Sequence, residues 1–289
     1  MVELSKILWQ NVKKLRDGVR NSGILGTMDP MIDKLVDYTF RPPSHETEAT
    51  LPLRLKLMIP QSCRVFRDLA AGVYEKELTL LFMRLAKNGM NIVDLGAHVG
   101  YYTVLASRLV GPKGKVYAFE PDPFNMDYLL KNIKRNDCSN VIAVRKAVSN
   151  RTGLAYFSVD PYHGQSHLST IASENSVMVQ TVRLDSFLKD EEWPRIDLIK
   201  ADIEGGERAA IEGMREICRR NPEILLIMEC NLNALHRFGT TREDLIAVLL
   251  SLDFRKGYVI ERKMEPFGVA KNFPNRSSTT YNLLLQRQE

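Results

Sequence analysis

The sequence predicts an α/β fold of the doubly wound, Rossmann-like kind, with a seven-stranded sheet whose last strand is antiparallel. Two observations carry this prediction: short apolar runs alternate with segments of helical periodicity, and several of these runs end in a carboxylate just before a turn. The 44% hydrophobic content supplies a large core for one main domain. We expect this domain over residues 71–289, behind an N-terminal helical cap region of residues 1–70.

The first predicted strand, Ile92–Leu95, leads into a turn and then a helix, Tyr101–Val110. Asp94 lies near the end of the strand, and Gly96 and Gly100 allow backbone to approach a ligand closely. In an open α/β sheet, cofactors bind at this carboxyl edge. The sequence therefore predicts a cofactor site here.

The glycine pattern of this turn argues against a dinucleotide. The G-x-G-x-x-G fingerprint would need glycines where the chain has His98 and Tyr101. The next strand, Lys115–Glu120, ends in a carboxylate at the same edge, which can accept hydrogen bonds from both ribose hydroxyls. We expect a cofactor that carries a ribose but no pyrophosphate.

The remaining elements follow from periodicity and turn residues. Residues 124–135 and 241–252 are predicted helices, the second opened by a Thr-x-x-Asp cap, and a helix that begins near Val73 ends at Asn88-Gly89. Further strands are expected at 141–144, 196–203 and 222–229, with 257–261 and 281–286 pairing last. Two extra strands, 154–159 and 177–184, flank a polar loop, Asp160–Asn175, whose length suits a specificity loop.

Three stretches carry a family resemblance. They are V-D-L-G-A-H-V-G from Val93, A-F-E-P from Ala118 and I-D-L-I-K-A-D-I-E-G from Ile196. Together they resemble the FkbM family of class I S-adenosylmethionine-dependent methyltransferases, from about Val73 to the C-terminus. The last stretch narrows the match to this family, whereas His98 departs from the asparagine that is usual there.

The resemblance implies S-adenosylmethionine as the cofactor. It places Ala147 against the adenine and Tyr74 and Glu75 over the pocket, although these two could also be an ordinary first-turn pair with Glu75 favoured by the helix dipole. The positions that it implies for cofactor binding are Tyr74, Glu75, Asp94, Gly96, Ala97, His98, Gly100, Tyr101, Glu120, Pro121, Ala147 and Asp202.

Candidate catalytic residues are Lys200, Asp202, Glu204 and His167. A period of two places the first three on one face of a strand end. They could act as a general base, bind a divalent metal or position the sulfonium by charge. A metal on Asp202, Glu204 and Glu207 is disfavoured because hard cations want more oxygen donors, so no metal is expected. His163 and His167 could contact substrate or accept a proton, or could be plain loop residues.

Composition limits the partners. A net charge of +5 at pH 7 does not demand nucleic acid, and the widely spaced cysteines form no metal or disulfide pattern. Met1–Gln10 lacks the apolar core of a signal peptide, and no apolar run approaches the roughly 20 residues of a membrane span, so we expect a cytoplasmic protein. The basic amphipathic stretch Leu4–Arg20 predicts a helix that either docks on the domain or on a second subunit of a homo-oligomer, or gives residues 1–24 weak contact with a membrane surface.

The function expected from these features is S-adenosylmethionine-dependent O-methylation of a hydroxyl on a sugar, glycan or other small molecule. Three alternatives remain open at this point. An NAD-dependent oxidoreductase would also use Glu120, a membrane-associated binding module would use the N-terminal helix, and an RNA methyltransferase would need a more basic or aromatic surface.

Overall fold

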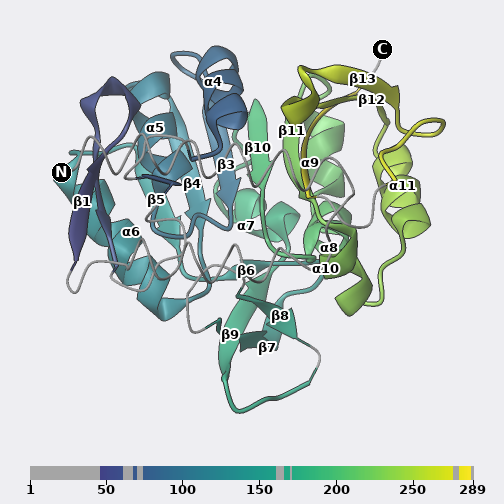
Figure 1. Cartoon of the computed structure of the whole chain (residues 1–289), viewed down its shortest axis with the longest axis horizontal. Helices are drawn as coiled ribbons and strands as arrows, with labels where there is room; N and C mark the ends of the chain where they lie inside the picture. The colour runs from purple at the N-terminus through teal and green to yellow at the C-terminus, as the bar shows by residue number, and fades with distance from the viewer. Residues whose placement is uncertain are drawn as a thin grey trace, which may run out of the picture.

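The fold is described by a computed structural model, over residues 46–60, 68–69, 74–160, 166–169, 171–275 and 280–287 (Figure 1). The predicted helix Leu4–Arg20 and His163 lie outside these ranges. Within them, no helix has both the length and the apolar character needed to cross a bilayer.

The main sheet has five parallel strands and, on one side of them, three strands that pair antiparallel. The parallel strands are β3 (Asn91–Leu95), β4 (Lys115–Phe119), β5 (Val141–Val144), β10 (Leu198–Ala201) and β11 (Leu225–Cys230). The antiparallel strands are β12 (Phe254–Val259), β13 (Glu265–Gly268) and β14 (Tyr281–Arg287), and the full order is β13-β12-β14-β11-β10-β3-β4-β5.

The α/β class and the antiparallel last strand are confirmed, but the main sheet has eight strands and not the predicted seven. The additional strand is β13, which pairs with β12 at the edge of the sheet. Its sequence, Glu-Pro-Phe-Gly, contains a proline, which has no backbone N–H to donate. Proline is tolerated in an edge strand because one side of that strand has no neighbour that would accept this hydrogen bond.

Apolar side chains alternate between two cores, one on each face of the sheet. Ile92 and Leu198 belong to one core, whereas the next residues along, Val93 and Ile199, belong to the other. One face is covered by α4 (Lys76–Leu85) and α5 (Tyr101–Val110). The other is covered by α7 (Leu184–Asp190), α8 (Glu207–Glu212), α9 (Arg215–Arg220), α10 (Leu232–Arg237) and α11 (Arg242–Ser251). Helices on both faces define a doubly wound sheet.

A second sheet is inserted between β5 and α7, and we call it the inserted sheet. It contains β6 (Ala147–Val148), β7 (Gly153–Ser158), β8 (His167–Ser169) and β9 (Ser176–Val182), in the order β6-β9-β7-β8. In Figure 1 it extends below the main sheet. The predicted extra strands at 154–159 and 177–184 are thus confirmed as β7 and β9, and the polar loop between them contributes β8.

Within the predicted cap region, residues 46–60 form a β-hairpin, whereas residues 68 and 69 are helical. β1 (Thr47–Thr50) and β2 (Lys56–Ile59) pair around a 3₁₀ turn, Pro52–Arg54. β2 is held by two amide side chains, Asn132 in α6 (Pro123–Arg135) and Asn136 directly after this helix. Asn132 forms hydrogen bonds with the N–H and C=O of Met58, and Asn136 forms them with those of Lys56. These amides replace a third strand, which a short hairpin needs for stability.

Candidate active site

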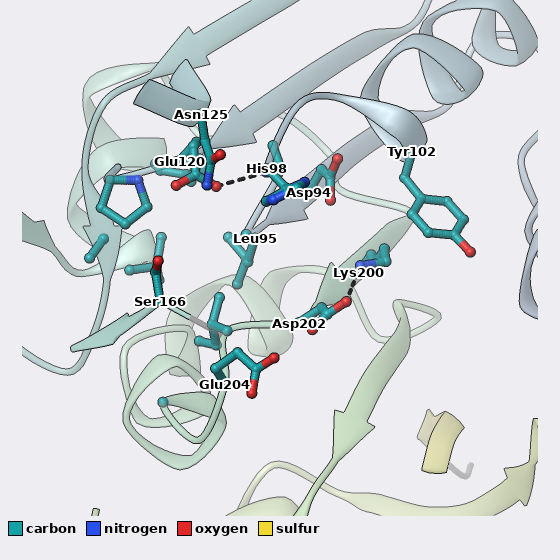
Figure 2. A pocket seen from close by; sticks show the side chains of 18 of the residues that line it. Asp94, Leu95, His98, Tyr102, Glu120, Asn125, Ser166, Lys200, Asp202 and Glu204 are labelled. Atoms are coloured by element: carbon teal, nitrogen blue, oxygen red, sulfur yellow. Dashed lines mark hydrogen bonds and ion pairs between the residues drawn. The ribbon is translucent and has the colours of Figure 1, made fainter. Parts of the chain in front are cut away.

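A cavity of about 270 Å³ opens at the carboxyl edge of the parallel strands, between the main sheet and the inserted sheet. Ligands of open α/β sheets bind at this edge. Figure 2 shows Glu120 with His98 and Asn125 on one side of Leu95, and Lys200 with Asp202 and Tyr102 on the other. The cavity wall therefore carries Glu120 in one part and the Lys200–Asp202 ion pair in another.

The turn after β3 is shaped by residues in the left-handed region. Gly96 has φ +78°, and a Cβ there would lie 1.9 Å from the backbone oxygen of Asp202, so only glycine fits. His98 lines the cavity and has φ +52°. Histidine and asparagine adopt this left-handed conformation more readily than most residues. Gly100 does not line the cavity; it begins α5 and packs close to Leu129.

Glu120 is held at the end of β4 by backbone donors. Its Oε2 accepts from His98 N at 2.7 Å, and its Oε1 accepts from Asp122 N at 2.9 Å. Burial, together with the charges of Asp122 and Asp94, raises the pKa of Glu120 to about 8, although the two backbone bonds oppose this. Each oxygen keeps a second lone pair, so the carboxyl group can still accept from a ligand's hydroxyls.

Asp94 and Lys200 are adjacent across β3 and β10. Lys200 Nζ lies 3.0 Å from Asp202 Oδ2 and 4.7 Å from the centre of the Tyr102 ring. Burial alone would lower the pKa of Lys200, but the facing Asp202 and Asp94 carboxylates raise it above its ordinary value. Asp94 Oδ2 accepts from Thr103 Oγ1 at 2.7 Å, whereas its buried Oδ1 has no hydrogen-bond partner in the described residues.

Tyr74 and Glu75 both line the cavity, as the family resemblance implies. Glu75 is a non-glycine residue with φ +38° directly before α4, and its Oε2 accepts from Tyr102 Oη at 2.8 Å. Burial raises the pKa of Glu75 to about 7, even though Lys200 opposes the shift. The Tyr74 ring meets the Tyr101 ring edge to face, with centroids 4.9 Å apart.

Glu204 follows β10 in a strained backbone conformation, φ +52°, and lines the cavity. Burial, with repulsion from Asp202 and Glu207, raises the pKa of Glu204 to about 8. Glu207 does not line the cavity; its Oε1 accepts from the N–H groups of Ile203 and Gly205 and so shapes the turn. Lys200, Asp202 and Glu204 are thus brought together at the cavity, as the sequence predicts.

His167 is not brought to the cavity. Its neighbours in the chain, Ser166 and Leu168, line the cavity, whereas the His167 ring packs edge to face against Phe238 at 5.7 Å. Successive residues of a strand point to opposite faces, which explains the alternation. The structure therefore does not support His167 as a catalytic residue.

Most of the predicted cofactor positions line the same cavity: Tyr74, Glu75, Asp94, Gly96, Ala97, His98, Tyr101, Glu120, Pro121, Ala147 and Asp202. Sequence reasoning missed Asn125 on α6, Phe157 of the inserted sheet and Glu229 of β11, which also line it. Glu229 could have been found, because its predicted strand also ends in a carboxylate at this edge.

The fold and the cavity define an α/β protein of the doubly wound class with a cofactor site at the carboxyl edge of its sheet. A sequence model described as "Methyltransferase FkbM domain" matches residues 94–258, more than half of the chain. The chain belongs to this family.

Two relatives show how far the similarity extends. The hexuronic acid methyltransferase AglP of Haloferax volcanii is 27% identical over 140 residues, covering 48% of this chain and 56% of AglP. The methyltransferase sdnD of Sordaria araneosa is 31% identical over 159 residues, covering 43% of this chain and 60% of sdnD. The chain thus spans less than two thirds of the length of either relative.

Among solved structures, M. jannaschii TYW2 in complex with AdoMet is 15% identical to this chain. The superposed region covers 85% of this chain and 88% of the TYW2 chain, with a TM-score of 0.44.

Proposed function

We propose that this protein is an S-adenosylmethionine-dependent methyltransferase that methylates a hydroxyl oxygen of a sugar or related small molecule. The observation that carries the proposal is the buried Glu120 at the end of β4, beside the glycine turn, in a chain that belongs to the FkbM methyltransferase domain family. The sugar acceptor draws support from AglP, which is described as a hexuronic acid methyltransferase.

The residues of the cavity suit each part of such a cofactor. Glu120 would accept from the ribose hydroxyls, and the apolar surfaces of Ala147 and Phe157 would contact the adenine. The unpartnered Asp94 Oδ1 would accept from the amino group of the methionine portion. A buried acceptor without a donor is costly, so a ligand that supplies one gains affinity.

The charge of the lining also fits a cationic ligand. Among the described residues that line the cavity are two lysines, Lys146 and Lys200, against six carboxyl groups, Glu75, Asp94, Glu120, Asp202, Glu204 and Glu229. When bound, S-adenosylmethionine supplies an electrophilic methyl group on a positively charged sulfonium. Those carboxyl groups that are ionised would attract that charge, and the others can still accept hydrogen bonds from the ligand.

The chain's own contribution to the reaction is alignment and proton transfer. Holding the acceptor oxygen in line with the methyl carbon supplies much of the rate acceleration. A neutral hydroxyl must also lose its proton, and the carboxylates that line this end of the cavity, Asp202 and Glu204, could accept it. Lys200 would hold Asp202 in place through the 3.0 Å ion pair.

The cofactor assignment is tested by calorimetry with S-adenosylhomocysteine. Glu120→Ala should weaken binding about 10- to 100-fold, as expected for the loss of hydrogen bonds between the ribose hydroxyls and a buried carboxyl group. Asp127→Ala, which removes an exposed carboxylate from α6, is the matched control and should bind like the wild type. Absence of binding by the wild type, or wild-type affinity in Glu120→Ala, would refute the assignment.

The acceptor class is tested separately, by mass spectrometry of a panel of uronic acid glycosides, neutral glycosides and amines incubated with S-adenosylmethionine. Methylation of a glycoside hydroxyl is the expected result. Transfer only to an amine would contradict the O-methylation part of the proposal while leaving the cofactor assignment intact.

A further inference from the structure

Three carboxylates meet at one end of the cavity. Asp202 and Glu204 follow β10, and Glu229 lies near the end of β11. Each of these side chains offers an oxygen, and the three oxygens lie within 4.8 Å of one another. Figure 2 shows Asp202 and Glu204 side by side in the cavity wall. Such spacing is what a single metal ion needs from three oxygen ligands.

The fold brings these residues together from two strands. β10 and β11 are parallel with Ala201 opposite Met228, so Asp202 and Glu229 are the next residues at the same edge. Glu204 is turned back by its own φ of +52° and by Gly205, where a Cβ would lie 2.6 Å from the backbone oxygen of Ala234. Strain of this kind persists where the surrounding structure fixes a functional geometry.

Two of the three carboxylates have an unused oxygen. Oε2 of Glu229 and Oε2 of Glu204 are both shielded from solvent, yet neither has a hydrogen-bond partner among the described residues. The Glu229 residue as a whole is half-buried, so the shielding concerns the Oε2 atom itself. Buried polar atoms in proteins are nearly always paired, so an unpaired carboxylate oxygen inside a cavity indicates a missing partner.

The neighbouring charges do not supply that partner. Lys200 forms its ion pair with Asp202, and the charge of Arg237 acts on Glu204 without a hydrogen bond among the described contacts. Glu207 adds a further negative charge close by. The carboxyl groups of Asp202, Glu204 and Glu229 lie close enough to repel one another when they are ionised. A bound cation would remove this repulsion.

We propose that Asp202, Glu204 and Glu229 bind one divalent cation with a preference for oxygen ligands, Mg²⁺ or Mn²⁺. Such ions keep several coordination positions for water or substrate when a protein supplies a few carboxylates. The sequence disfavours a metal on Asp202, Glu204 and Glu207 because that stretch alone offers few donors. In the folded chain the third carboxylate is Glu229 of the adjacent strand and not Glu207.

The site lies where an acceptor would bind, and this part of the inference rests on the proposed function. The backbone oxygen of Asp202 faces Gly96 of the cofactor turn, so the cation would adjoin the cofactor position. A metal ion there would coordinate an acceptor hydroxyl and lower its pKa. Adjacent hydroxyls of a sugar could occupy two of its open positions.

The test is Mn²⁺ binding by the full chain, measured by electron paramagnetic resonance without cofactor, with Mg²⁺ as a competitor. We expect one Mn²⁺ per chain, displaced by Mg²⁺. Glu229→Gln keeps the side-chain shape and should weaken Mn²⁺ binding at least 10-fold. Glu223→Gln makes the same change at an exposed position before β11 and should leave binding unchanged.

Binding of S-adenosylhomocysteine is measured on the same samples, so the two proposals fail separately. If the wild type binds S-adenosylhomocysteine but no Mn²⁺, or if Glu229→Gln binds Mn²⁺ like the wild type, the cation site is refuted and the cofactor assignment stands. If the wild type binds Mn²⁺ at this site but no S-adenosylhomocysteine, the cofactor assignment fails and the cation site stands. Wild-type thermal stability in Glu229→Gln shows that a lost Mn²⁺ signal is not due to unfolding.

Discussion

Several residues that line the cavity are constrained in backbone conformation or in charge, so substituting them has measurable effects. Gly96, His98, Glu75 and Glu204 all have positive φ and all line the cavity. Strained conformations cluster at binding sites because packing around the site enforces them. Substitutions at these positions should therefore affect ligand binding and stability together.

Gly96→Ala is expected to destabilise the fold more than Gly89→Ala. Both glycines have a similar positive φ, +78° and +82°, so both variants carry the left-handed cost of about 1–2 kcal/mol. Only at Gly96 would the new Cβ meet backbone, 1.9 Å from Asp202 O, which adds about 1–3 kcal/mol of overpacking. Urea unfolding of the two variants gives the difference, and equal losses of stability would contradict the predicted clash.

Glu120 should make stability depend on pH. Its pKa is about 8 in the folded protein, against an ordinary value of 4.5, so between these values the folded state holds a proton that the unfolded state has lost. Stability should therefore fall as pH rises from about 4.5 to 8, by an amount on the order of a few kcal/mol from this residue.

The contribution of Glu120 is isolated with Glu120→Gln, which cannot ionise. The wild type should lose stability relative to this variant as pH rises through the window, measured by urea unfolding at several pH values. A difference that stays constant with pH, or that changes in the opposite direction, would show that Glu120 ionises normally in the folded protein.

The residues of the candidate site were predictable where they end an apolar strand. Asp94 and Glu120 follow runs whose periodicity is plain, and both line the cavity. Glu229 was missed as a site residue because its proximity to Asp202 depends on the pairing of β10 with β11. The prediction of His167 rests on its chemistry alone, whereas Leu168 of β8 and Ser166, directly before β8, line the cavity instead.

At the scale of elements, α6 connects the N-terminal hairpin to the cofactor turn. Asn132 bonds both polar groups of Met58 and also donates to Val99 O of the turn at 2.7 Å. Asn136, one turn further along, bonds both polar groups of Lys56. One helix face therefore fixes the position of β2 and of the turn that carries His98.

Asn132→Leu should cost about 3 kcal/mol or more, because it leaves one buried and two partly buried backbone groups without partners. Amide hydrogen exchange at Met58 should become faster as the hairpin loosens. Asn136→Leu is the comparison, with a smaller expected loss because that residue is only half-buried. Equal losses in the two variants would contradict a special role for Asn132.

The sequence predicts the parallel strands well and the small antiparallel elements poorly. Ile92–Leu95 and Lys115–Phe119 are apolar runs with carboxylates and turns after them. β1 and β2 are four residues each, and their stabilising partner is α6, about 80 positions away in the chain. Short strands of this kind depend on tertiary contacts that no local pattern records.

At the scale of the whole molecule, the cavity draws on segments from Leu69 to Glu229. A ligand that contacts so many elements binds only the folded chain. It should therefore stabilise the entire fold by mass action.

S-adenosylhomocysteine at 100 times its Kd should add about 2.7 kcal/mol to the free energy of unfolding and raise the Tm by several degrees. NAD should not, because His98 and Tyr101 occupy positions where a dinucleotide turn needs glycine. Differential scanning calorimetry with each compound compares the two. An equal rise with NAD would favour the oxidoreductase alternative.

Within the inserted sheet, the segment from β7 to β9 begins and ends at paired residues, since Gly153 of β7 lies opposite Thr181 of β9. Its two ends therefore stay together whatever lies between them. Evolution can lengthen, shorten or replace the hairpin without shifting β10 or the helices that cover it. Because Phe157 and Leu168 line the cavity, such exchanges would reshape one wall of it, including the surface of the proposed adenine contact, while leaving Asp94, Glu120 and Asp202 in place.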